Sequence, residues 1–278
     1  MKTLNKKYIL LSFDVEEFDI PLEYGLEISE EEQFAVSKTG LTSLLNLLDA
    51  LNIRATLFTT TTFAIKYPKL IKKAAEKHEI ASHGLDHNPP TDDDIIKSKK
   101  ILEEIIETEI KGFRCPRLQE ISEKNLSSGR FTYNSSENPI YLPGRYNNFF
   151  KPRTVYVTNN NILNIPISAS PIVRFPLFWL AFKNIPLPII KFFSKWTLMH
   201  DKYLNLFYHP WEFSDLTPYA LPKIIKKYSH NKMLKRLENY LRYLQSLNAS
   251  FITMHEFEKI IRKEHTTQSH HLSKKRRT

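Results

Sequence analysis

Short apolar segments alternate with amphipathic helical segments in the N-terminal half of this chain, and no other feature limits its fold as strongly. The segments 8–13, 53–59 and 79–82 predict strands, and a helix between the first two is predicted by the face formed by Leu41, Leu44, Leu45, Leu48 and Leu51. Uninterrupted apolar strands are typical of a parallel sheet that is covered on both faces. The alternation therefore predicts an α/β protein built on a parallel sheet or barrel.

The same alternation returns at the C-terminal end, after a middle region that is harder to interpret. Residues 131–175 are rich in Asn, Ser and Pro, and 175–193 are strongly apolar but interrupted by prolines. We leave open whether 175–193 lies in the core or forms an apolar rim that contacts a membrane surface. We expect a single catalytic domain over 1–263 and a basic, disordered tail over 264–278.

Polar residues stand where several of the predicted strands end. Asp14 and Glu16 follow the first strand, His83 and His87 follow 79–82, Arg114 follows a later strand and His209 follows 203–208. Because the carboxyl ends of parallel strands meet at one rim, we expect these side chains to converge on one site.

The two histidines predict a metal site. His83 and His87 are four residues apart, so a helical turn or a tight loop aims both imidazoles at a common point. A third ligand is needed, and the acidic stretch 14–17 is the best source of a carboxylate. Two histidines and a carboxylate suit a divalent metal, zinc best, with cobalt, nickel, manganese and iron as alternatives.

Taken together, these segments resemble the NodB-homology polysaccharide deacetylases, the carbohydrate esterase family 4 type. The residue patterns Asp-Val-Glu-Glu and His-Pro-Trp-Glu are most similar to the branch of the family found with exopolysaccharide and surface-glycan synthesis. Order and approximate spacing agree over about residues 8–120 and 203–262. The matching segments are Ser12-Phe13-Asp14-Val15-Glu16, His83-Gly84-Leu85-Asp86-His87, Arg114-Cys115-Pro116 and Leu206-Phe207-Tyr208-His209.

The resemblance implies a distorted (β/α) barrel with about seven parallel strands and a hydrolase that removes N-acetyl groups from glycans. It implies the following roles: Asp14 as general base, Glu16, His83 and His87 as metal ligands, His209 as general acid, Arg114 as the residue that orients Asp14, and Pro116, Trp211 and Glu212 in substrate binding.

The chain departs from the family pattern at several points. One residue separates the two acids, which leaves Glu17 as an alternative ligand, and Gly84 stands where the family has Ser or Thr. No match is found between 120 and 200 to the family motif that contains Asp and Trp. His200-Asp201 imitates the last motif, but the cleaner strand before His209 favours His209.

Composition limits the partners and the compartment. The net charge of +10 favours acidic partners, but no basic motif with interleaved aromatic residues indicates nucleic acid. Cys115 is the only cysteine, and the N-terminal apolar run is too short for a signal peptide. We therefore expect a cytoplasmic enzyme with an N-acetylated glycan substrate that is lipid- or nucleotide-linked, and with peripheral membrane contact. The oligomeric state is left open.

Two alternative functions fit the same residues. One is an allantoinase-like hydrolase of small C–N bonds on the same fold. The other is a non-catalytic glycan-binding pseudoenzyme, for which the altered acid pair and Gly84 are the supporting observations.

Overall fold

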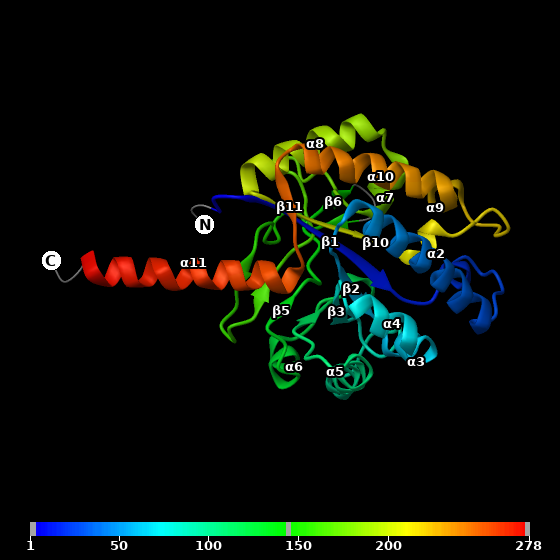
Figure 1. The fold of residues 1–278 in the computed structure, drawn as a ribbon, viewed down its shortest axis with the longest axis horizontal. Coiled ribbons are helices and arrows are strands. Elements are labelled where there is room, and N and C mark those ends of the chain that lie inside the picture. Colours follow the sequence, from blue (N-terminus) through cyan, green and yellow to red (C-terminus); the bar gives the residue numbers. More distant parts are fainter. Residues whose placement is uncertain (1–3, 143–145, 276–278) are drawn as a thin grey trace.

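The computed structural model describes residues 4–142 and 146–275, and its centre is a curled, mostly parallel sheet of nine strands (Figure 1). The strand order is β10-β1-β2-β3-β4-β5-β9-β8, and β11 also pairs with β1. Every pairing in the sheet is parallel except β8 with β9. The strands are β1 (Lys7–Val15), β2 (Thr56–Thr59), β3 (Glu79–Ser82), β4 (Gly112–Phe113), β5 (Tyr133–Asn134), β8 (Tyr156–Val157), β9 (Leu163–Asn164), β10 (Tyr203–Tyr208) and β11 (Ala249–Phe251), with a separate hairpin of β6 (Tyr141–Leu142) and β7 (Tyr146–Asn147).

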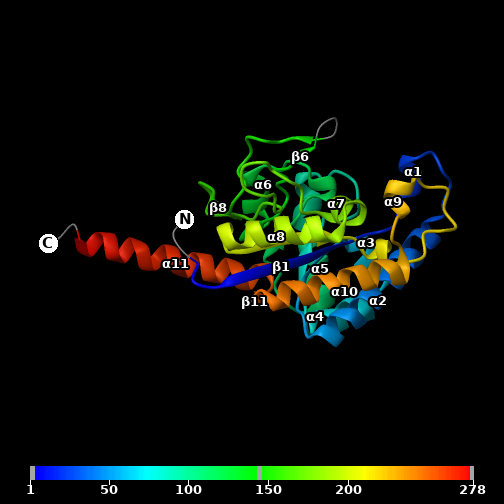
Figure 2. The same cartoon turned by 90° about the horizontal axis from the view of Figure 1, so that it is seen from above.

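Helices cover the outer face of this sheet, with α8 and α10 on one side and α3, α4 and α5 on the other (Figures 1 and 2). Two of their starts follow directly from the sequence, because Ser29 caps α2 and Thr91 forms a capping box with Asp94 at α5. The helices are α1 (Ile20–Glu23), α2 (Glu30–Leu51), α3 (Thr61–Lys66), α4 (Pro68–Ala75), α5 (Asp92–Ile106), η1 (Pro116–Leu118), α6 (Glu123–Ser128), α7 (Trp179–Asn184), α8 (Leu187–Asp201), η2 (Pro210–Phe213), α9 (Lys223–Lys226), α10 (His230–Ser246) and α11 (Met254–Lys275).

The side chains of β1 point alternately into two separate hydrophobic clusters. Ile9, Leu11 and Phe13 pack in the large cluster with the surrounding helices, whereas Leu10 belongs to a smaller cluster inside the curl of the sheet. Successive side chains of a strand point to opposite faces. The interior face of β1 therefore continues from Leu10 through Ser12 to Asp14, and it carries polar residues only toward its C-terminal end.

The curl is closed by hydrogen bonds rather than by another strand. The segment after β9 meets β10 where the Ser168 amide donates to the Asn205 carbonyl at 3.0 Å. The buried Asn205 side chain then donates to the carbonyls of Ile165 and Pro166 at 2.9 and 3.1 Å. The α/β fold class and the barrel-like parallel sheet are therefore confirmed, with one antiparallel strand at the edge.

The structure divides the apolar stretch 175–193 between core and surface. Leu177 to Phe182 are buried, whereas Ile189 and Phe192 on α8 are exposed. Helix α11 also extends further than we expected, because it continues to Lys275 where the sequence predicted a disordered tail; residues 276–278 lie outside the described part. Among the described residues, no helix is long and apolar enough to span a membrane.

Candidate metal centre and catalytic cleft

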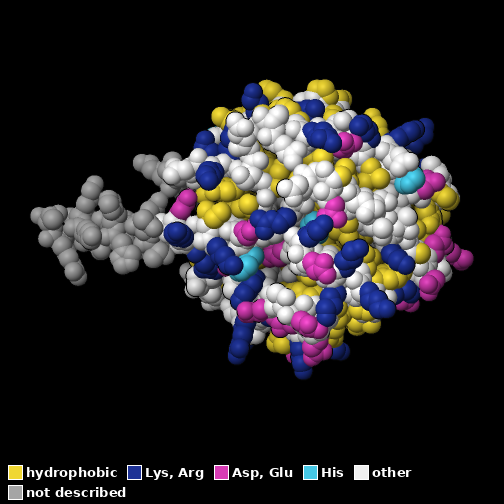
Figure 3. Space-filling view, in the orientation of Figure 1, with side chains coloured by type: hydrophobic (Ala, Val, Ile, Leu, Met, Phe, Trp, Pro, Cys, Tyr) yellow, Lys and Arg dark blue, Asp and Glu magenta, His cyan; other side chains and the backbone are white. Residues whose placement is uncertain are grey.

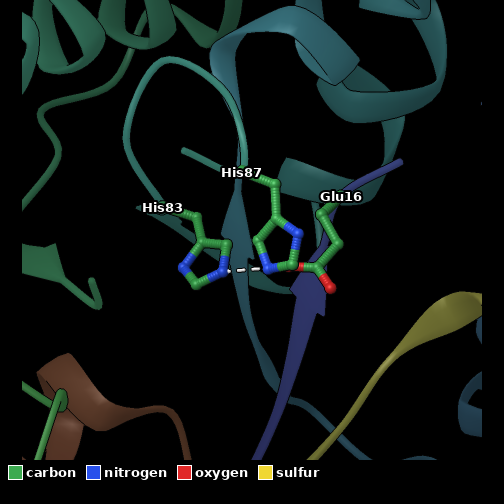
Figure 4. A group of neighbouring side chains, drawn as sticks. All are labelled: Glu16, His83 and His87. Carbon is green, nitrogen blue, oxygen red and sulfur yellow. Dashed lines mark hydrogen bonds and ion pairs between the residues drawn. The ribbon is translucent and has the colours of Figure 1, made fainter. Parts of the chain in front are cut away.

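Glu16, His83 and His87 form a buried cluster at the C-terminal ends of β1 and β3 (Figure 4). The Glu16 Oε2 atom lies 3.1 Å from His83 Nε2 and 3.2 Å from His87 Nε2. Ligand atoms about 2.1 Å from a tetrahedral zinc ion lie about 3.4 Å from one another. The two distances from Glu16 to the histidines are therefore close to those that a small divalent cation requires, and all three ligand atoms lie within 4.8 Å of one another.

The spacing of the acids decides which carboxylate reaches this cluster. Asp14 and Glu16 are two residues apart and point to the same side of an extended chain, and both line the cleft. Glu17 points elsewhere, and its Oε1 accepts a hydrogen bond from the His87 amide at 3.3 Å. The one-residue gap between the two acids thus turns Glu16, and not Glu17, toward the histidines.

Gly84 explains the second departure from the family pattern. Its φ of +85° lies in the left-handed region, where a residue with a side chain is strained. Its carbonyl accepts hydrogen bonds from the Thr61 amide and hydroxyl, both at 3.1 Å, at the start of α3. The glycine therefore shapes the loop that carries both histidines, and Thr61 braces it from outside.

Each histidine is oriented through its other ring nitrogen. His83 Nδ1 is 2.8 Å from the Arg114 carbonyl, and His87 Nδ1 is 2.9 Å from Asp19 Oδ2. A carbonyl and a carboxylate can only accept, so we assign the proton of each neutral ring to Nδ1, which leaves the Nε2 lone pairs aimed at the common point. This arrangement is typical of metal-binding histidines. The sequence analysis missed Asp19, although it lies two residues after the acidic stretch 14–17.

The electrostatics of the cluster favour a cation. Burial opposes ionisation of Glu16, but the three neighbouring histidines outweigh it and lower its pKa to about 2. For His87, burial lowers the pKa, yet Glu16 and Asp19 raise it to about 9. The carboxylates thus hold positive charge at this point, and a divalent ion would compete there with the imidazole proton.

Arg114 fixes Asp14 beside the cluster. The buried guanidinium donates from Nη1 to Asp14 Oδ1 at 2.6 Å, and from Nε and Nη2 to the carbonyl and hydroxyl of Ser135 at 3.1 and 3.0 Å. It lies 4.1 Å from the Phe58 ring centroid and 5.2 Å from that of Phe207. Asp14 is therefore held in one position at the wall of the cleft.

His209 follows β10, the strand that pairs with β1 on the side away from β2. Its Nε2 is 3.8 Å from Glu16 Oε1, and its ring stacks on that of Trp211 at 5.0 Å between centroids. The Trp179 ring lies perpendicular to it at 5.1 Å between centroids. Burial lowers the pKa of His209, but the hydrogen bond with Glu212 and the nearby carboxylates raise it above its usual value overall.

The sequence analysis missed a second layer of charged residues behind His209. Glu212 Oε1 accepts from the His209 amide at 2.9 Å, and the fully buried Lys183 lies 3.5 Å from Glu212 Oε2. A lysine inside an apolar run was the available signal, because an isolated charge is buried only with a partner. Gly40 of α2 permits this turn, since a Cβ there would lie 1.9 Å from the Pro210 carbonyl oxygen.

These groups line an open cleft of about 710 Å³. Of the residues predicted to bind substrate, Trp211 lines this cleft, but Pro116 and Glu212 do not. Pro116 lies against Gly84 under the histidine loop, and Glu212 is turned back to cap the His209 turn. His200, the alternative acid, sits on α8 with an exposed side chain and contacts Asp201.

Comparisons with known proteins agree with this geometry. Residues 1–130, just under half of the chain, match the family model described as polysaccharide deacetylase, which confirms the resemblance. A search of curated proteins finds no match.

Solved structures share the fold along nearly the whole chain. A Mycobacterium smegmatis protein provisionally named a polysaccharide deacetylase is 16% identical, with a TM-score of 0.64 over 95% of this chain and 93% of that one. Puue allantoinase is 15% identical, with a TM-score of 0.63 over 92% and 91%. A Bacillus anthracis pseudoenzyme of the CE4 family is 12% identical, with a TM-score of 0.51 over 91% and 66%.

Proposed function

We propose that the protein is a metal-dependent hydrolase that removes N-acetyl groups from sugar residues of a glycan. The cluster of Glu16, His83 and His87, flanked by Asp14 on one wall and His209 on another, is the observation that carries this proposal. Glu16, His83 and His87 would hold the metal ion. The roles of Asp14 as base and His209 as acid follow from where they line the cleft.

A bound divalent ion, zinc by the chemistry of the donor set, polarises the acetyl carbonyl and lowers the pKa of water. Asp14, fixed by Arg114, takes a proton from the water that attacks the amide carbon. The C–N bond then breaks, and His209, protonated and oriented by Glu212, gives its proton to the departing amine. The products are acetate and an amino sugar.

Hydrolysis of a small cyclic amide is the second candidate, because the fold is shared with an allantoinase as closely as with a deacetylase. The same carboxylate, imidazoles and cation would serve that reaction. The aromatic wall of Phe178, Trp179 and Trp211 favours a sugar, because pyranose rings present C–H faces that pack on aromatic rings.

We also propose that the glycan is lipid-linked and that the protein acts in the cytoplasm at an anionic phospholipid surface. The support is the exposed apolar side chains of Ile189, Phe192 and Met199 on α8, a helix that also carries Lys191 and Lys195. Hydrophobic side chains are visible at the upper edge of the molecule, where α8 lies (Figure 3). Apolar side chains with flanking lysines suit the interface of an anionic membrane.

The first test measures metal content and acetate release together. Purified protein should contain about one divalent ion per chain by elemental mass spectrometry, and the loaded protein should release acetate from N-acetylated oligosaccharides. Turnover of allantoin without acetate release would select the second candidate. Sugar binding that a chelator leaves unchanged, without acetate release, would identify a pseudoenzyme. Flotation with phosphatidylglycerol vesicles, lost in Phe192→Ser, tests the membrane contact.

A further inference from the structure

Three buried polar side chains inside the barrel form a hydrogen-bonded chain that ends at Asp14. They are Arg114, Ser135 and Asn205, and each is fully buried. Ser135 directly follows β5 and Asn205 lies on β10, so the chain crosses the interior of the barrel. None of the three lines the metal-binding cleft. Any effect on the reaction must therefore pass through a residue that does line it, and Asp14 is the one to which this chain is hydrogen-bonded.

The Ser135 hydroxyl uses its whole hydrogen-bonding capacity within this chain. It donates to the Ile165 carbonyl at 2.9 Å and accepts from Arg114 Nη2 and Asn205 Nδ2, both at 3.0 Å. A hydroxyl group has one proton and two lone pairs, so these partners fix its orientation. The Ser135 carbonyl also accepts from Arg114 Nε at 3.1 Å. Ser135 therefore holds two nitrogens of the guanidinium, and the third donates to Asp14.

Arg114 connects Asp14 with the metal cluster. Its guanidinium donates to Asp14 Oδ1 at 2.6 Å, and its carbonyl oxygen lies 2.8 Å from His83 Nδ1. One residue thus places the proposed base relative to a proposed metal ligand. The backbone of Arg114 is held separately, because its amide donates to the Ser82 carbonyl at 3.0 Å. A shift of the guanidinium alone would therefore move Asp14 and leave His83 in place.

Asn205 bears a cost that closure of the barrel alone does not require. Its Nδ2 donates to Ser135 Oγ and to the carbonyls of Ile165 and Pro166, but its Oδ1 is buried without a hydrogen-bond partner among the described residues. An unpaired buried acceptor lowers stability. The Ser168 amide and the Asn205 carbonyl already join the same two segments. The side chain is accounted for if its donors are needed to hold the Ser135 hydroxyl in one orientation.

We propose that Ser135 and Asn205 are positioning residues for the general base: they act through Arg114 and hold Asp14 where it takes the proton from the attacking water. This inference rests on the proposed function. Small displacements of a catalytic group reduce the rate steeply, by about a hundredfold for roughly 1 Å. Because neither residue contacts the cleft or the metal cluster, their loss should lower kcat and leave KM and metal content unchanged.

Ser135→Ala tests the centre of the chain, since it removes the hydroxyl with little change in shape. On metal-loaded protein, kcat for acetate release from tri-N-acetylchitotriose should fall about tenfold to a hundredfold, at unchanged KM. The matched control is Thr56→Val, at the start of β2, which removes another fully buried hydroxyl, one that bonds Glu79 and the Met254 amide. The control should lower Tm and leave kcat unchanged. Counting kcat per bound metal ion removes the contribution of unfolded protein.

Asn205→Ala tests the far end of the chain. It should lower kcat about threefold to tenfold, and the double variant with Ser135→Ala should be no slower than Ser135→Ala alone, because Asn205 acts through the hydroxyl. Losses that multiply in the double variant would overturn the inference. So would an unchanged kcat in Ser135→Ala, a rise in KM that accounts for the whole loss, or an equal loss of kcat in Thr56→Val.

A measurement without turnover separates this inference from the proposed function. Urea unfolding compares Ser135→Ala, Asp14→Asn and the double variant. If Arg114 couples the two residues, the unfolding constant of the double variant should differ at least about threefold from the value expected for independent effects. Independent effects would reject the chain even if acetate is released. Coupled effects without acetate release would retain the chain and reject the deacetylase.

Discussion

Two glutamates with enclosed carboxyl groups lie at opposite ends of the barrel, and their surroundings differ in kind. Glu79 begins β3, and its carboxyl group accepts hydrogen bonds from the Tyr133 hydroxyl at 2.6 Å, the Thr56 hydroxyl at 2.8 Å and the His255 amide at 3.1 Å. Glu16, at the other end, faces the Nε2 atoms of three histidines instead. Hydrogen bonds from the fold itself surround the Glu79 carboxyl group, whereas the Glu16 carboxyl group belongs to a cluster that could hold a metal ion.

The pKa values of the two groups move in opposite directions. Burial raises the pKa of Glu79 despite its hydrogen bonds, whereas the histidines lower that of Glu16 to about 2 although burial opposes this. Burial thus favours the neutral form of Glu79, whereas the histidines favour the charged form of Glu16. A polar cluster at the end of a barrel therefore does not by itself indicate a functional site. A functional site is indicated when several side chains aim lone pairs at one common point, as around Glu16.

The largest difference in metal content and turnover is expected between variants that replace a histidine beside Glu16 and a histidine beside Glu79. His87→Ala removes one of three ligands, so metal content should fall to background and turnover by on the order of a thousandfold or more. Elemental mass spectrometry and acetate release measure the two effects. His255→Ala, beside the other glutamate, is the matched control and should keep both metal and rate. Full metal occupancy in His87→Ala would remove it from the ligand set.

Asp14→Asn tests whether Asp14 accepts a proton without binding the metal, at the C-terminal end of the strands, which we call the functional end. The amide keeps the shape of the carboxylate but cannot take a proton, so the rate should fall on the order of a hundredfold while the metal stays bound. Parallel measurement of kcat and metal content separates the two roles. Loss of metal from this variant would make Asp14 a ligand and would require another role for Glu16.

Much of the functional end could be predicted from the sequence because one topological rule governs it. Parallel strands end at a common rim, so Asp14, His83, Arg114 and His209 could be brought together without knowing the strand order. The alternation of side chains along an extended strand also accounts for Glu16 over Glu17, although the sequence analysis left both open.

The remaining parts depend on contacts between distant segments that carry no local pattern. Asp19 meets His87 across 68 positions, and Lys183 reaches Glu212 from a helix in the apolar stretch. Glu212 has the spacing of a capping residue three positions after His209, but the sequence analysis assigned it to substrate binding from the family resemblance. The asparagine-rich segment folds into two-residue strands, which are too short to show a period.

Asp19→Asn should produce an intermediate effect at the functional end. The amide can still contact His87 but loses the charge that orients and supports the ring, so metal affinity should fall about tenfold to a hundredfold. Competition with a chromophoric chelator measures this affinity. Glu23→Gln is the matched control, because Glu23 also contacts Arg117 but not the histidine. Equal loss of affinity in both variants would assign the effect to Arg117 instead.

The smallest effect is expected at the other end, where Glu79→Gln should alter the pH dependence of stability and leave the metal in place. Because the pKa of Glu79 is raised in the folded protein, the folded state binds this proton more tightly than the unfolded chain. The resulting stabilisation is present below the usual glutamate pKa and is lost as pH rises through the folded-state value. Urea unfolding between pH 4 and 8 should therefore show a smaller decline for Glu79→Gln than for the wild type. At low pH the two should differ by no more than about 1 kcal/mol, since the amide can keep most of the hydrogen bonds. A steeper decline in the variant would mean that Glu79 is held charged, as Glu16 is, and the contrast between the two ends would fail.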